Sequence, residues 1–461
     1  MLAVLLAVSW GVAGLLWKRE HDKASAQERI ALAHGLALHA AELRDADPST
    51  ARNLDLAAVR IHPDEQTRAA LIDAMVGMRG KELTLDSSVE VVLSGDGRIA
   101  LAGGDEVSVW DLTTWLDPEI VNKADQVAVL KDRREGLSTM ALSGDGRTAL
   151  TGGDVGDTIV WDLTHPAKPI RAAALAGGKN AKDDASVLAV ALSRDGRTAV
   201  IADLGGDLTV WSLTDRSRPV RLSVTRAYPS SVVSDLRLSA DGGMAVISYR
   251  DGAVTVWDLS DPSRPVKSAD LALPGEHATA TTTAMSADGR VILVAKAYRT
   301  GVDNAYWAER AEVWNLDDKS RPVRTAAFDV PLADIYGMAL TPDGKTALLA
   351  GASESAILWD LSDPSRPARL AALKGYAREI SSVALGGDGG VALVAGDGGV
   401  FLWDLRGLAE IVADPERAAC GVNPGTEISK ADWARYTGGA DWSDYKGEHF
   451  LDDALAVCFI R

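Results

Sequence analysis

The sequence contains few side chains of the types that perform acid–base or nucleophilic chemistry. It has 461 residues with 7 His and 2 Cys, and between residues 81 and 406 the only histidines are His165 and His277, with no cysteine. This leaves little material for a histidine general base, a cysteine nucleophile or a zinc site. The composition therefore favours a non-enzymatic protein with no catalytic residue, no metal and no cofactor.

The segment Gly344-Lys345-Thr346 has the last three residues of a phosphate-binding loop. That loop needs a glycine five positions before its second glycine, and Ala339 stands there instead. The segment also matches six other turns of the chain, and no helix follows it to bind a phosphate group. We therefore predict no nucleotide site.

The carboxylates are numerous, but they repeat along the chain, which indicates structural units. Seven segments of the type S-x-D-G-R lie between short apolar or alternating runs, as in MALSGDGRTALTGG at 140–153. Asp-Gly suits a tight hairpin because glycine accepts a positive φ and aspartate tolerates it. The seven pairs begin at Asp96, Asp145, Asp195, Asp241, Asp288, Asp343 and Asp388.

Each hairpin is followed by a strand that ends in tryptophan, usually as W-D-L and in three repeats as V-W-D-L. Successive tryptophans are separated by 44 residues (Trp359 to Trp403) to 57 residues (Trp257 to Trp314), a spacing typical of four-stranded units. We expect these rings to be structural and to pack between neighbouring sheets. They are Trp110, Trp161, Trp211, Trp257, Trp314, Trp359 and Trp403.

The period, the turn and the W-D-L strand end resemble those of WD40-repeat β-propellers, over about residues 82–406. The resemblance implies an all-β fold, a seven-bladed WD40-like propeller, since seven is the family's commonest number of blades. The Gly-His pair that opens a WD40 repeat is almost absent, and the family's b–c turn aspartate fits best at Asp251 and Asp397. We therefore expect a thinner internal polar network than in a typical member.

Two predictions concern the strands at the edges of the blades. The phrase WDLSDPSRPVK at 257–267, which returns as WDLSDPSRPAR at 359–369, predicts a turn and then an outer edge strand, where proline is tolerated best. No such strand follows Trp403, whereas the alternating segment KELTLDSS begins at residue 81. We predict that this segment pairs with the seventh blade and closes the ring, so that no sheet edge stays exposed.

The first 17 residues carry no charged side chain and are followed by KREHDK. As a helix they would span about 25 Å, close to the hydrocarbon core of about 30 Å. A signal peptide is the alternative, but its only A-x-A site, at 24–26, follows the charged run. We predict a transmembrane helix at 1–17 that anchors the protein in a membrane as a single-pass protein.

The side of the membrane on which the propeller lies stays open. Lys18, Arg19 and Lys23 would hold the following chain inside by the positive-inside rule. The two cysteines, Cys420 and Cys458, fit one disulfide in an exported compartment and fit two cytosolic thiols equally well. We favour the disulfide and an extracytoplasmic propeller.

The segments on both sides of the propeller, which spans residues 81–406, are predicted as separate parts. Residues 18–80 read as a helical stalk, with helices that begin at Asp47-Pro48 and at His62-Pro63. Residues 407–461 read as a C-terminal appendage packed on the ring. The D-P helix start and SKADWARY at 429–436 are similar to segments of bacterial signalling proteins of the STAND NTPase–WD40 type. This similarity implies a membrane-plus-propeller half whose effector domain is absent from this chain.

One blade interrupts the repeat and supplies the candidate partner-binding residues. In blade five the segment AKAYRTGVDNAYWAERAEVW, at 295–314, is about ten residues longer than its counterparts. In WD40 propellers the loops at this position lie on the usual partner-binding face, and aromatic residues and arginine are enriched at interfaces. The alternative is a tolerated loop whose aromatic rings pack on the ring. The candidate residues are Tyr298, Arg299, Tyr306, Trp307 and Arg310.

The formal net charge of -17 argues against a nucleic-acid partner, which requires clustered Lys and Arg. Together these features predict a membrane-anchored, non-enzymatic protein-interaction scaffold or sensor module with an unidentified protein partner. The alternative is a propeller that binds a small ligand or acts as a lactonase-like hydrolase with a metal in its central channel. That function would need His, Glu or Asp side chains from several blades.

Overall fold

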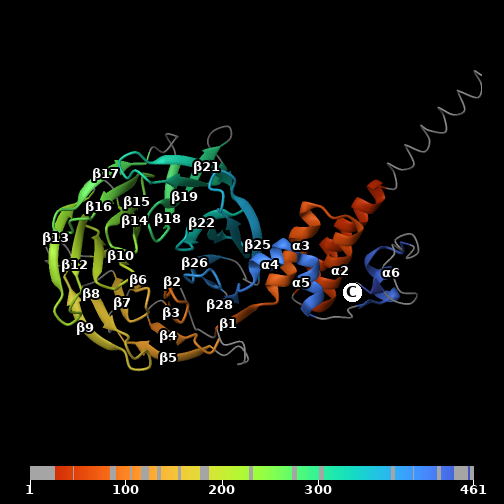
Figure 1. The fold of residues 1–461 in the computed structure, drawn as a ribbon, viewed down its shortest axis with the longest axis horizontal. Coiled ribbons are helices and arrows are strands. Elements are labelled where there is room, and N and C mark those ends of the chain that lie inside the picture. The colour runs from red at the N-terminus through yellow and green to blue at the C-terminus, as the bar shows by residue number, and fades with distance from the viewer. Residues whose placement is uncertain are drawn as a thin grey trace, which may run out of the picture. The chain divides into compact units, whose positions relative to one another are not determined.

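The computed structural model describes residues 26–44, 46–83, 90–103, 106–115, 124–131, 137–153, 157–176, 186–227, 232–271, 278–300, 306–374, 379–397, 399–422, 427–440 and 455–456. The chain divides into two compact units. One comprises Gly80–Arg406, and the other comprises the residues before and after it. Figure 1 shows the first unit as a ring of β-sheets and the second as a group of helices.

The larger unit is a seven-bladed β-propeller, because its strands form seven antiparallel sheets of four strands each. Each blade runs from an inner strand near the centre of the ring to an outer strand at the rim (Figure 1). The all-β, seven-bladed prediction is confirmed. Blades one and two are β2 (Glu90–Leu93), β3 (Ile99–Gly103), β4 (Val107–Asp111), β5 (Asp125–Leu130), β6 (Leu137–Leu142), β7 (Thr148–Gly153), β8 (Thr158–Asp162) and β9 (Ile170–Leu175).

The other five blades follow in the same order along the chain. Blades three and four are β10 (Val187–Leu192), β11 (Thr198–Asp203), β12 (Asp207–Ser212), β13 (Val220–Arg226), β14 (Val233–Leu238), β15 (Met244–Tyr249), β16 (Val254–Asp258) and β17 (Val266–Asp270). Blades five and six are β18 (Ala278–Met285), β19 (Val291–Thr300), β20 (Tyr306–Asn315), β21 (Val323–Asp329), β22 (Ala333–Leu340), β23 (Thr346–Ala352), β24 (Ser355–Asp360) and β25 (Ala368–Lys374). Blade seven is β26 (Ile380–Leu385), β27 (Val391–Gly396), β28 (Gly399–Asp404) and β1 (Gly80–Leu83).

The Asp-Gly segments form the hairpins between the inner strand and the second strand of each blade. In blade one, Gly97 has a φ of 71°, which glycine adopts without strain. Ser94 Oγ donates a hydrogen bond to Asp96 Oδ1 (2.6 Å) and accepts one from the Ile99 N–H (2.9 Å). The hydroxyl residue makes the same two bonds in five further blades, at Ser143, Ser193, Ser239, Ser286 and Thr341.

The ring closes through the strand that precedes the first repeat. β1 pairs with β28, with Gly80 opposite Trp403 and Leu83 opposite Val400. Leu83 is 2% exposed and belongs to an apolar cluster that contains residues of blades seven and one. Closure by the predicted segment is therefore confirmed at Gly80–Leu83, while the rest of that segment, 84–88, lies outside the described residues.

Proline immediately precedes five of the outer strands, as the repeated phrase predicts. β17 begins at Val266, directly after Pro265, and pairs only with β16, so that its other edge needs no proline N–H. The prolines that precede the other four outer strands are Pro169, Pro219, Pro322 and Pro367.

Apolar clusters that combine residues of neighbouring blades contain six of the recurrent tryptophans, as expected, namely Trp110, Trp161, Trp211, Trp257, Trp314 and Trp359. Six of the seven are buried, and Trp211 is partly buried. The indole Nε1 of Trp161 donates to Thr151 Oγ1 (2.9 Å) and that of Trp257 to Thr255 Oγ1 (2.9 Å). Within the part of the chain that the structure describes, the Nε1 atoms of Trp110, Trp211 and Trp359 have no hydrogen-bond partner. This agrees with a thin polar network.

The smaller unit is helical, and its helices come from both ends of the chain. Residues 26–43 form a helix, and the further elements are α2 (Pro48–Ile61), α3 (Glu65–Gly77), α4 (Leu408–Ala413), α5 (Pro415–Val422), β29 (Glu427–Ile428), α6 (Lys430–Tyr436) and β30 (Leu455–Ala456). The Asp47 carboxylate caps α2 by accepting from the Thr50 N–H (3.0 Å). α3 begins two residues later than Pro63 because Asp64 is its N-cap and forms a capping box with Thr67.

The sequence predicts separate parts at 18–80 and 407–461, whereas the structure joins their helices in one unit. α5 contacts both α2 and α3, and α4 contacts α3. Helices as short as α4 and α5 are not stable alone. They bury Ile411 and Ala419 in this unit instead.

The predicted membrane anchor at 1–17 lies outside the described residues. Among the helices that the structure does describe, none has both the length and the apolar character needed to span a membrane.

Candidate functional site in the propeller channel

The seven inner strands surround a central channel that contains two adjoining cavities. At the end where the inner strands begin, residues of all seven strands line a cavity of about 270 Å³, which we name the channel mouth. A second cavity of about 250 Å³ lies further along the strands and shares eight lining residues with the first, Val91 and Arg237 among them. The channel is therefore the part of the propeller to which every blade contributes.

Three ionisable side chains, Glu90, Asp235 and Arg237, break the repeat in the described lining of the channel mouth. Arg237 stands four positions before the turn aspartate of blade four. Glu90 stands six positions before the turn aspartate of blade one, and Asp235 stands six before that of blade four. Neutral residues occupy the sixth position in the other five blades. The residues equivalent to Arg237 are Val92, Ala141, Ala191, Ala284, Ala339 and Ala384.

Asp235 uses both carboxylate oxygens to hold neighbouring groups. Its Oδ2 accepts from the Thr283 N–H (2.8 Å), from Thr283 Oγ1 (2.8 Å) and from Arg237 Nε (3.1 Å). Its Oδ1 accepts from the Leu236 N–H (2.9 Å). Because Thr283 lies on β18, this carboxylate fastens blade four to blade five and leaves little capacity for a ligand.

Arg237 is held at Nε and open at its far end. Nε also donates to the Thr283 carbonyl oxygen (3.0 Å), and the side chain is 41% exposed. The terminal nitrogens Nη1 and Nη2 make no hydrogen bond with any residue that the structure describes. The guanidinium is thus fixed in position while its bidentate edge remains available.

Glu90 lies in the same cavity and has an unusual protonation state. Burial raises the pKa of its carboxyl to about 8, while the charge of Arg237 and a hydrogen bond from the Met140 N–H oppose the rise. The charge of Asp235 adds to the rise. Its Oε2 is buried and has no hydrogen-bond partner within the described part of the chain. At neutral pH Glu90 is therefore mostly a neutral acid that can donate a hydrogen bond.

Backbone hydrogen bonds link the blades at the other end of the channel. The residue before each turn aspartate lies close to its equivalent in the next blade, and five N–H to carbonyl bonds of 2.8 or 2.9 Å join them. The chain of bonds is interrupted between Pro342, which has no N–H, and Gly387, and it is also interrupted between Gly95 and Gly144, although both of these residues are described. The donor–acceptor pairs are Gly144–Arg194, Arg194–Ala240, Ala240–Ala287, Ala287–Pro342 and Gly387–Gly95.

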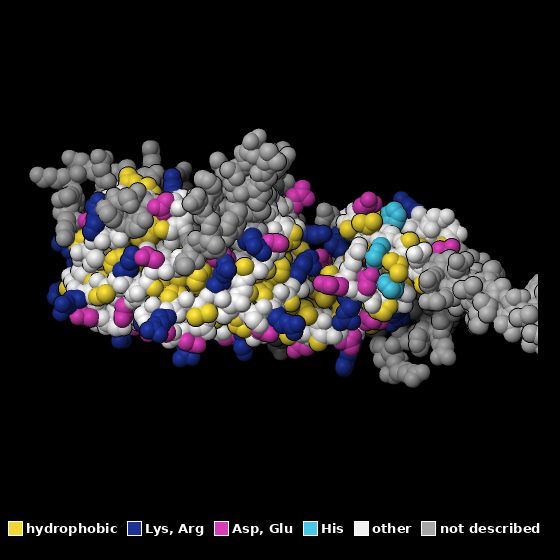
Figure 2. All heavy atoms as spheres, turned by 90° about the horizontal axis from the view of Figure 1, so that it is seen from above, with side chains coloured by type: hydrophobic (Ala, Val, Ile, Leu, Met, Phe, Trp, Pro, Cys, Tyr) yellow, Lys and Arg dark blue, Asp and Glu magenta, His cyan; other side chains and the backbone are white. Residues whose placement is uncertain are grey.

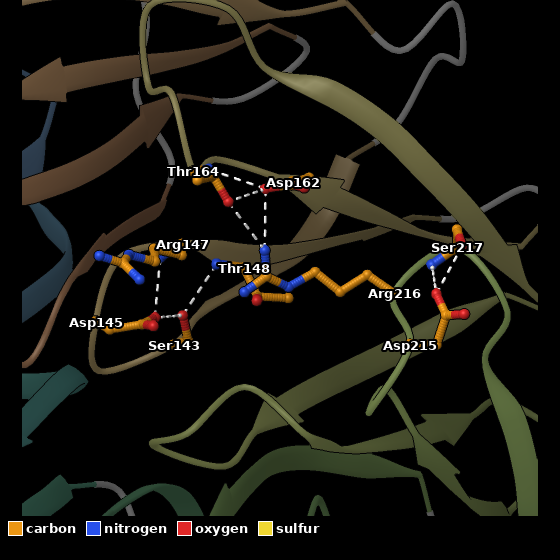
Figure 3. A network of polar contacts seen from close by, with 9 residues as sticks. All are labelled: Ser143, Asp145, Arg147, Thr148, Asp162, Thr164, Asp215, Arg216 and Ser217. Carbon is orange, nitrogen blue, oxygen red and sulfur yellow. Dashed lines mark hydrogen bonds and ion pairs between the residues drawn. The ribbon is translucent and has the colours of Figure 1, made fainter.

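Ion pairs outside the channel link particular blades. Arg216 Nη1, in the turn after β12, donates to Asp162 Oδ1 (3.0 Å) and Thr164 Oγ1 (3.2 Å) at the end of β8 (Figure 3). Burial raises the pKa of Asp162, but the hydrogen bonds from Thr164 and the charge of Arg216 outweigh it, so that the pKa lies below its ordinary value. Lys319 and Asp258 form the equivalent pair between blades five and four (3.6 Å).

The residues at these two positions vary together in most blades. Where blades three and five have Arg216 and Lys319, the turns of blades two, four and six have proline. Each proline turn faces the strand end of the preceding blade. The residue at that strand end is Ser212 in blade three and Asn315 in blade five, so it has no carboxylate. Only blade one, which precedes blade two, keeps a carboxylate there, at Asp111. The ion pairs therefore join blade two to three and blade four to five.

The insertion in blade five forms a two-stranded ribbon rather than the expected loop. β19 and β20 have 10 residues each, against 5 in β3 and 7 in β23. They stay paired to their ends, with Tyr298 opposite Ala308 and Arg299 opposite Trp307. The alternating sequence continues the strand pattern through the insertion, which explains why it pairs instead of forming a loop.

The five predicted partner-binding residues therefore lie on adjacent strands. Tyr298 and Arg299 are on β19, and Tyr306, Trp307 and Arg310 are on β20. Arg310 Nε contacts Asp329 Oδ1 (2.8 Å) on β21, while the side chains of the other four lie outside what the structure describes.

A buried charge cluster supports the base of this ribbon. Glu312 is 1% exposed and accepts from Arg324 Nη1 (3.0 Å) and Trp314 Nε1 (3.2 Å). Lys296 is fully buried, and burial lowers the pKa of its amine although Glu312 opposes this. A buried charge of this kind needs its partners, so the cluster fixes the three outer strands of blade five to one another.

The smaller unit has polar groups of its own. Histidine side chains gather on it (Figure 2), and His34 and His62 approach Asp64 Oδ2 at 2.7 and 3.5 Å. Cys420 on α5 is disulfide-bonded, and the only other cysteine of the sequence, Cys458, lies outside the described residues. Among described residues, no group of three or more His, Cys, Asp or Glu side chains is placed to hold a metal ion.

Comparison with solved structures supports the fold. The β-propeller domain of Cps50 (Swd1) from Myceliophteria thermophila aligns with a TM-score of 0.54 and 15% identity, over 70% of this chain and 98% of that chain. The two share the β-propeller fold. At this identity the likeness shows the fold alone, and no family model matches the sequence.

One curated protein shares a short segment with this chain. The NAD(+) hydrolase ApTIR from Actinoplanes sp. is 39% identical over 89 residues, which are 18% of this chain and 12% of that protein. Because the match covers only 12% of ApTIR, its hydrolase activity is not transferred to this chain.

Sequence reasoning missed the charged residues of the channel mouth. The repeat itself contains the signal, because alignment on the Asp-Gly turns shows Arg237 where six blades have Val or Ala. Glu90 and Asp235 stand out at the neighbouring position in the same alignment. Glu90 and Asp235 are overlooked when every carboxylate of the repeats is interpreted as a turn residue.

Proposed function

We propose that the protein is an interaction scaffold whose propeller binds a partner protein on the face at which its inner strands begin. The observation that carries this proposal is the blade-five ribbon. β19 ends 12 residues after Asp288, whereas β7, β11 and β15 each end 8 residues after their turn aspartates. The four extra residues lengthen the strand by about 13 Å.

The ribbon and the channel mouth belong to the same face. Each inner strand runs from this face to its hairpin, and the second strand returns to it. Thr300, at the end of β19, is therefore on the same side of the ring as Glu90, at the start of β2. A partner that contacts the ribbon would also cover the channel mouth.

The composition of the ribbon supports the proposal, since Tyr, Trp and Arg are enriched among residues that dominate binding energy. The candidate contacts are Tyr298, Arg299, Tyr306, Trp307 and Arg310. The buried cluster below them favours a rigid ribbon, which reduces the entropy lost on binding.

The proposed scaffold is not an enzyme. The alternative, a hydrolase with a metal in the channel, finds less support in the described lining, where both oxygens of Asp235 already accept hydrogen bonds and Arg237, which donates one of them, lines the same cavity. We also propose that residues 1–17 tether the scaffold to a membrane, with the propeller outside the cytoplasm. Protease digestion of intact cells tests this, because a cytoplasmic propeller would be protected.

The binding proposal is tested by quantitative pull-down with the full chain. The double variant Tyr306→Ala/Trp307→Ala should lose most of the co-purified partner, since hot-spot residues, among which Tyr and Trp are enriched, contribute about 2 kcal/mol or more each. The matched control is Val266→Ala/Val323→Ala, which removes two residues of 60% and 59% exposure at the starts of outer strands. Equal recovery of the partner with the ribbon variant and with the parent protein would refute the proposal.

A further inference from the structure

The channel mouth contains two hydrogen-bonding groups that the described protein leaves unused. They are the terminal nitrogens of Arg237 and Oε2 of Glu90, which come from blades four and one and line one cavity. Asp235 and the Thr283 carbonyl orient the guanidinium through Nε without covering its outer edge. The unused groups are therefore donors when Glu90 is protonated, and a ligand that fits them must supply acceptors.

We propose that the channel mouth is a binding site for a small polar carboxylate, held between the terminal nitrogens of Arg237 and Oε2 of Glu90. A carboxylate offers two coplanar acceptor oxygens, which match the two parallel N–H groups of a guanidinium edge. A cation is disfavoured because Arg237 would repel it and both oxygens of Asp235 already accept hydrogen bonds.

The cavity restricts the size and polarity of the ligand. A volume of about 270 Å³ lies just below the usual range of about 300–1,000 Å³ for ligand pockets, which suits an acid of a few carbon atoms. The inner strands pair within their blades on one side only, so their other edge has backbone N–H and C=O groups that face the channel. Neighbouring blades already use some of them, since the Val91 N–H donates to Ser382 Oγ (3.1 Å). Ser234, Thr282 and Ser381 add hydroxyl groups to the lining. A hydroxylated or dicarboxylic acid thus fits better than a fatty acid.

The same carboxylate chemistry can come from a free acid or from an aspartate or glutamate side chain of a bound protein segment. Calorimetric titration of the full chain distinguishes these sources. The free ligands are lactate and succinate, the segment is represented by a blocked Gly-Asp-Gly peptide, and lactamide is the uncharged analogue. Inorganic phosphate tests whether the site instead prefers a tetrahedral anion.

Two variants and one control make the titration specific. Arg237→Ala introduces the residue that five other blades carry here, so the fold should persist while affinity falls about 10-fold or more. Glu90→Gln keeps a neutral donor. In the parent protein, binding should weaken as pH rises through about 8, because Glu90 loses its proton, whereas Glu90→Gln should bind equally at pH 7 and pH 9. Arg264→Ala, at an exposed turn of the same blade, should bind as the parent does.

The outcomes separate clearly. Binding of either free acid, or of the peptide alone, with loss in Arg237→Ala supports the site and identifies the source of the carboxylate. Equal binding of lactate and lactamide, preference for phosphate, or undiminished binding by Arg237→Ala overturns it. No binding of any carboxylate by the parent protein also overturns it, and leaves the proposed partner binding by the ribbon untouched.

Discussion

Arg237 introduces a charge at a position where the other blades place Val or Ala, and the residues around it compensate for that charge. Asp235 accepts from its Nε, and the Thr283 carbonyl accepts from the same nitrogen. Removal of one partner from such a pair commonly costs more than the pair contributes, since the remaining charge is left without compensation. Arg237 and Asp235 are therefore best regarded as one unit that aims a guanidinium into the channel.

Glu90 gives this region a predictable dependence on pH. The pKa of its carboxyl is about 8 in the folded protein, against 4.5 for an ordinary glutamate, so the folded state binds more protons between these values. The free energy of unfolding should therefore fall as pH rises from about 4.5 to about 8. Glu90→Gln lacks this dependence, so its melting temperature relative to the parent should rise by about 2 °C or more between pH 5 and pH 9.

Thermal unfolding of both proteins at pH 5, 7 and 9 measures this difference. Parallel curves would show that Glu90 titrates as an ordinary exposed carboxylate. The buried oxygen of Glu90 would then be accessible to water, contrary to the structure.

The Asp-Gly hairpins of blades seven and one approach each other so closely at the far end of the channel that Gly387 has no room for a side chain. An added Cβ at Gly387 would lie 2.0 Å from the Gly95 carbonyl oxygen, whereas one at Gly386 would meet nothing closer than 3.5 Å. Gly387→Ala must therefore move backbone and break a bond between blades seven and one, at a cost of about 1–3 kcal/mol.

Gly386→Ala is the matched control for this prediction. It should change stability by about 0.5 kcal/mol or less, and it can stabilise by restricting the unfolded chain. Chemical denaturation of both variants measures the difference. If the two variants were equally stable, the close approach of the blades at Gly387 would be wrong.

The ion pair between blades two and three should contribute little to stability. Arg216 and Asp162 are 27% and 34% exposed, and pairs of such exposure contribute about 1 kcal/mol or less. Arg216→Pro introduces the residue of blades two, four and six, so it should keep the fold and let the pKa of Asp162 rise toward its ordinary value.

A double-mutant cycle with Asp162→Ser, which introduces the residue type found at the strand end Ser212, isolates the pair. We expect a coupling free energy below about 1 kcal/mol. A coupling of several kcal/mol would mean that the pair is a main connection between the blades rather than a local contact.

For the molecule as a whole, closure of the ring by β1 is the decisive long-range contact. Leu83 is buried between blades seven and one, whereas Glu82, beside it on the same strand, is exposed. Leu83→Ala should lower the free energy of unfolding of the propeller by about 2–5 kcal/mol. Glu82→Ala should leave it within about 0.5 kcal/mol of the parent. Calorimetry of the two variants tests this, and equal melting temperatures would contradict closure by β1.

The repeat made most of the propeller predictable from the sequence. The hairpins at Asp-Gly, the tryptophan positions and the closing strand at KELTLDSS depend on short patterns that recur or stand directly beside the repeats. The joining of the terminal segments in one unit was not predictable, because α3 and α5 are separated by more than 300 residues and no local pattern encodes their contact. Likewise, the extra length of the blade-five segment alone predicts a longer loop, whereas the structure extends the pairing of β19 and β20.

The proposed function depends on the binding of a partner protein to the propeller face that bears the blade-five ribbon. Its most direct test is photo-crosslinking in intact cells, with a photoreactive phenylalanine analogue at position 307 on β20 and, in a parallel experiment, at position 266 on the rim. We predict one discrete crosslinked product from position 307 and none from position 266. A product from position 266 alone, or equal products from both positions, would contradict the claim.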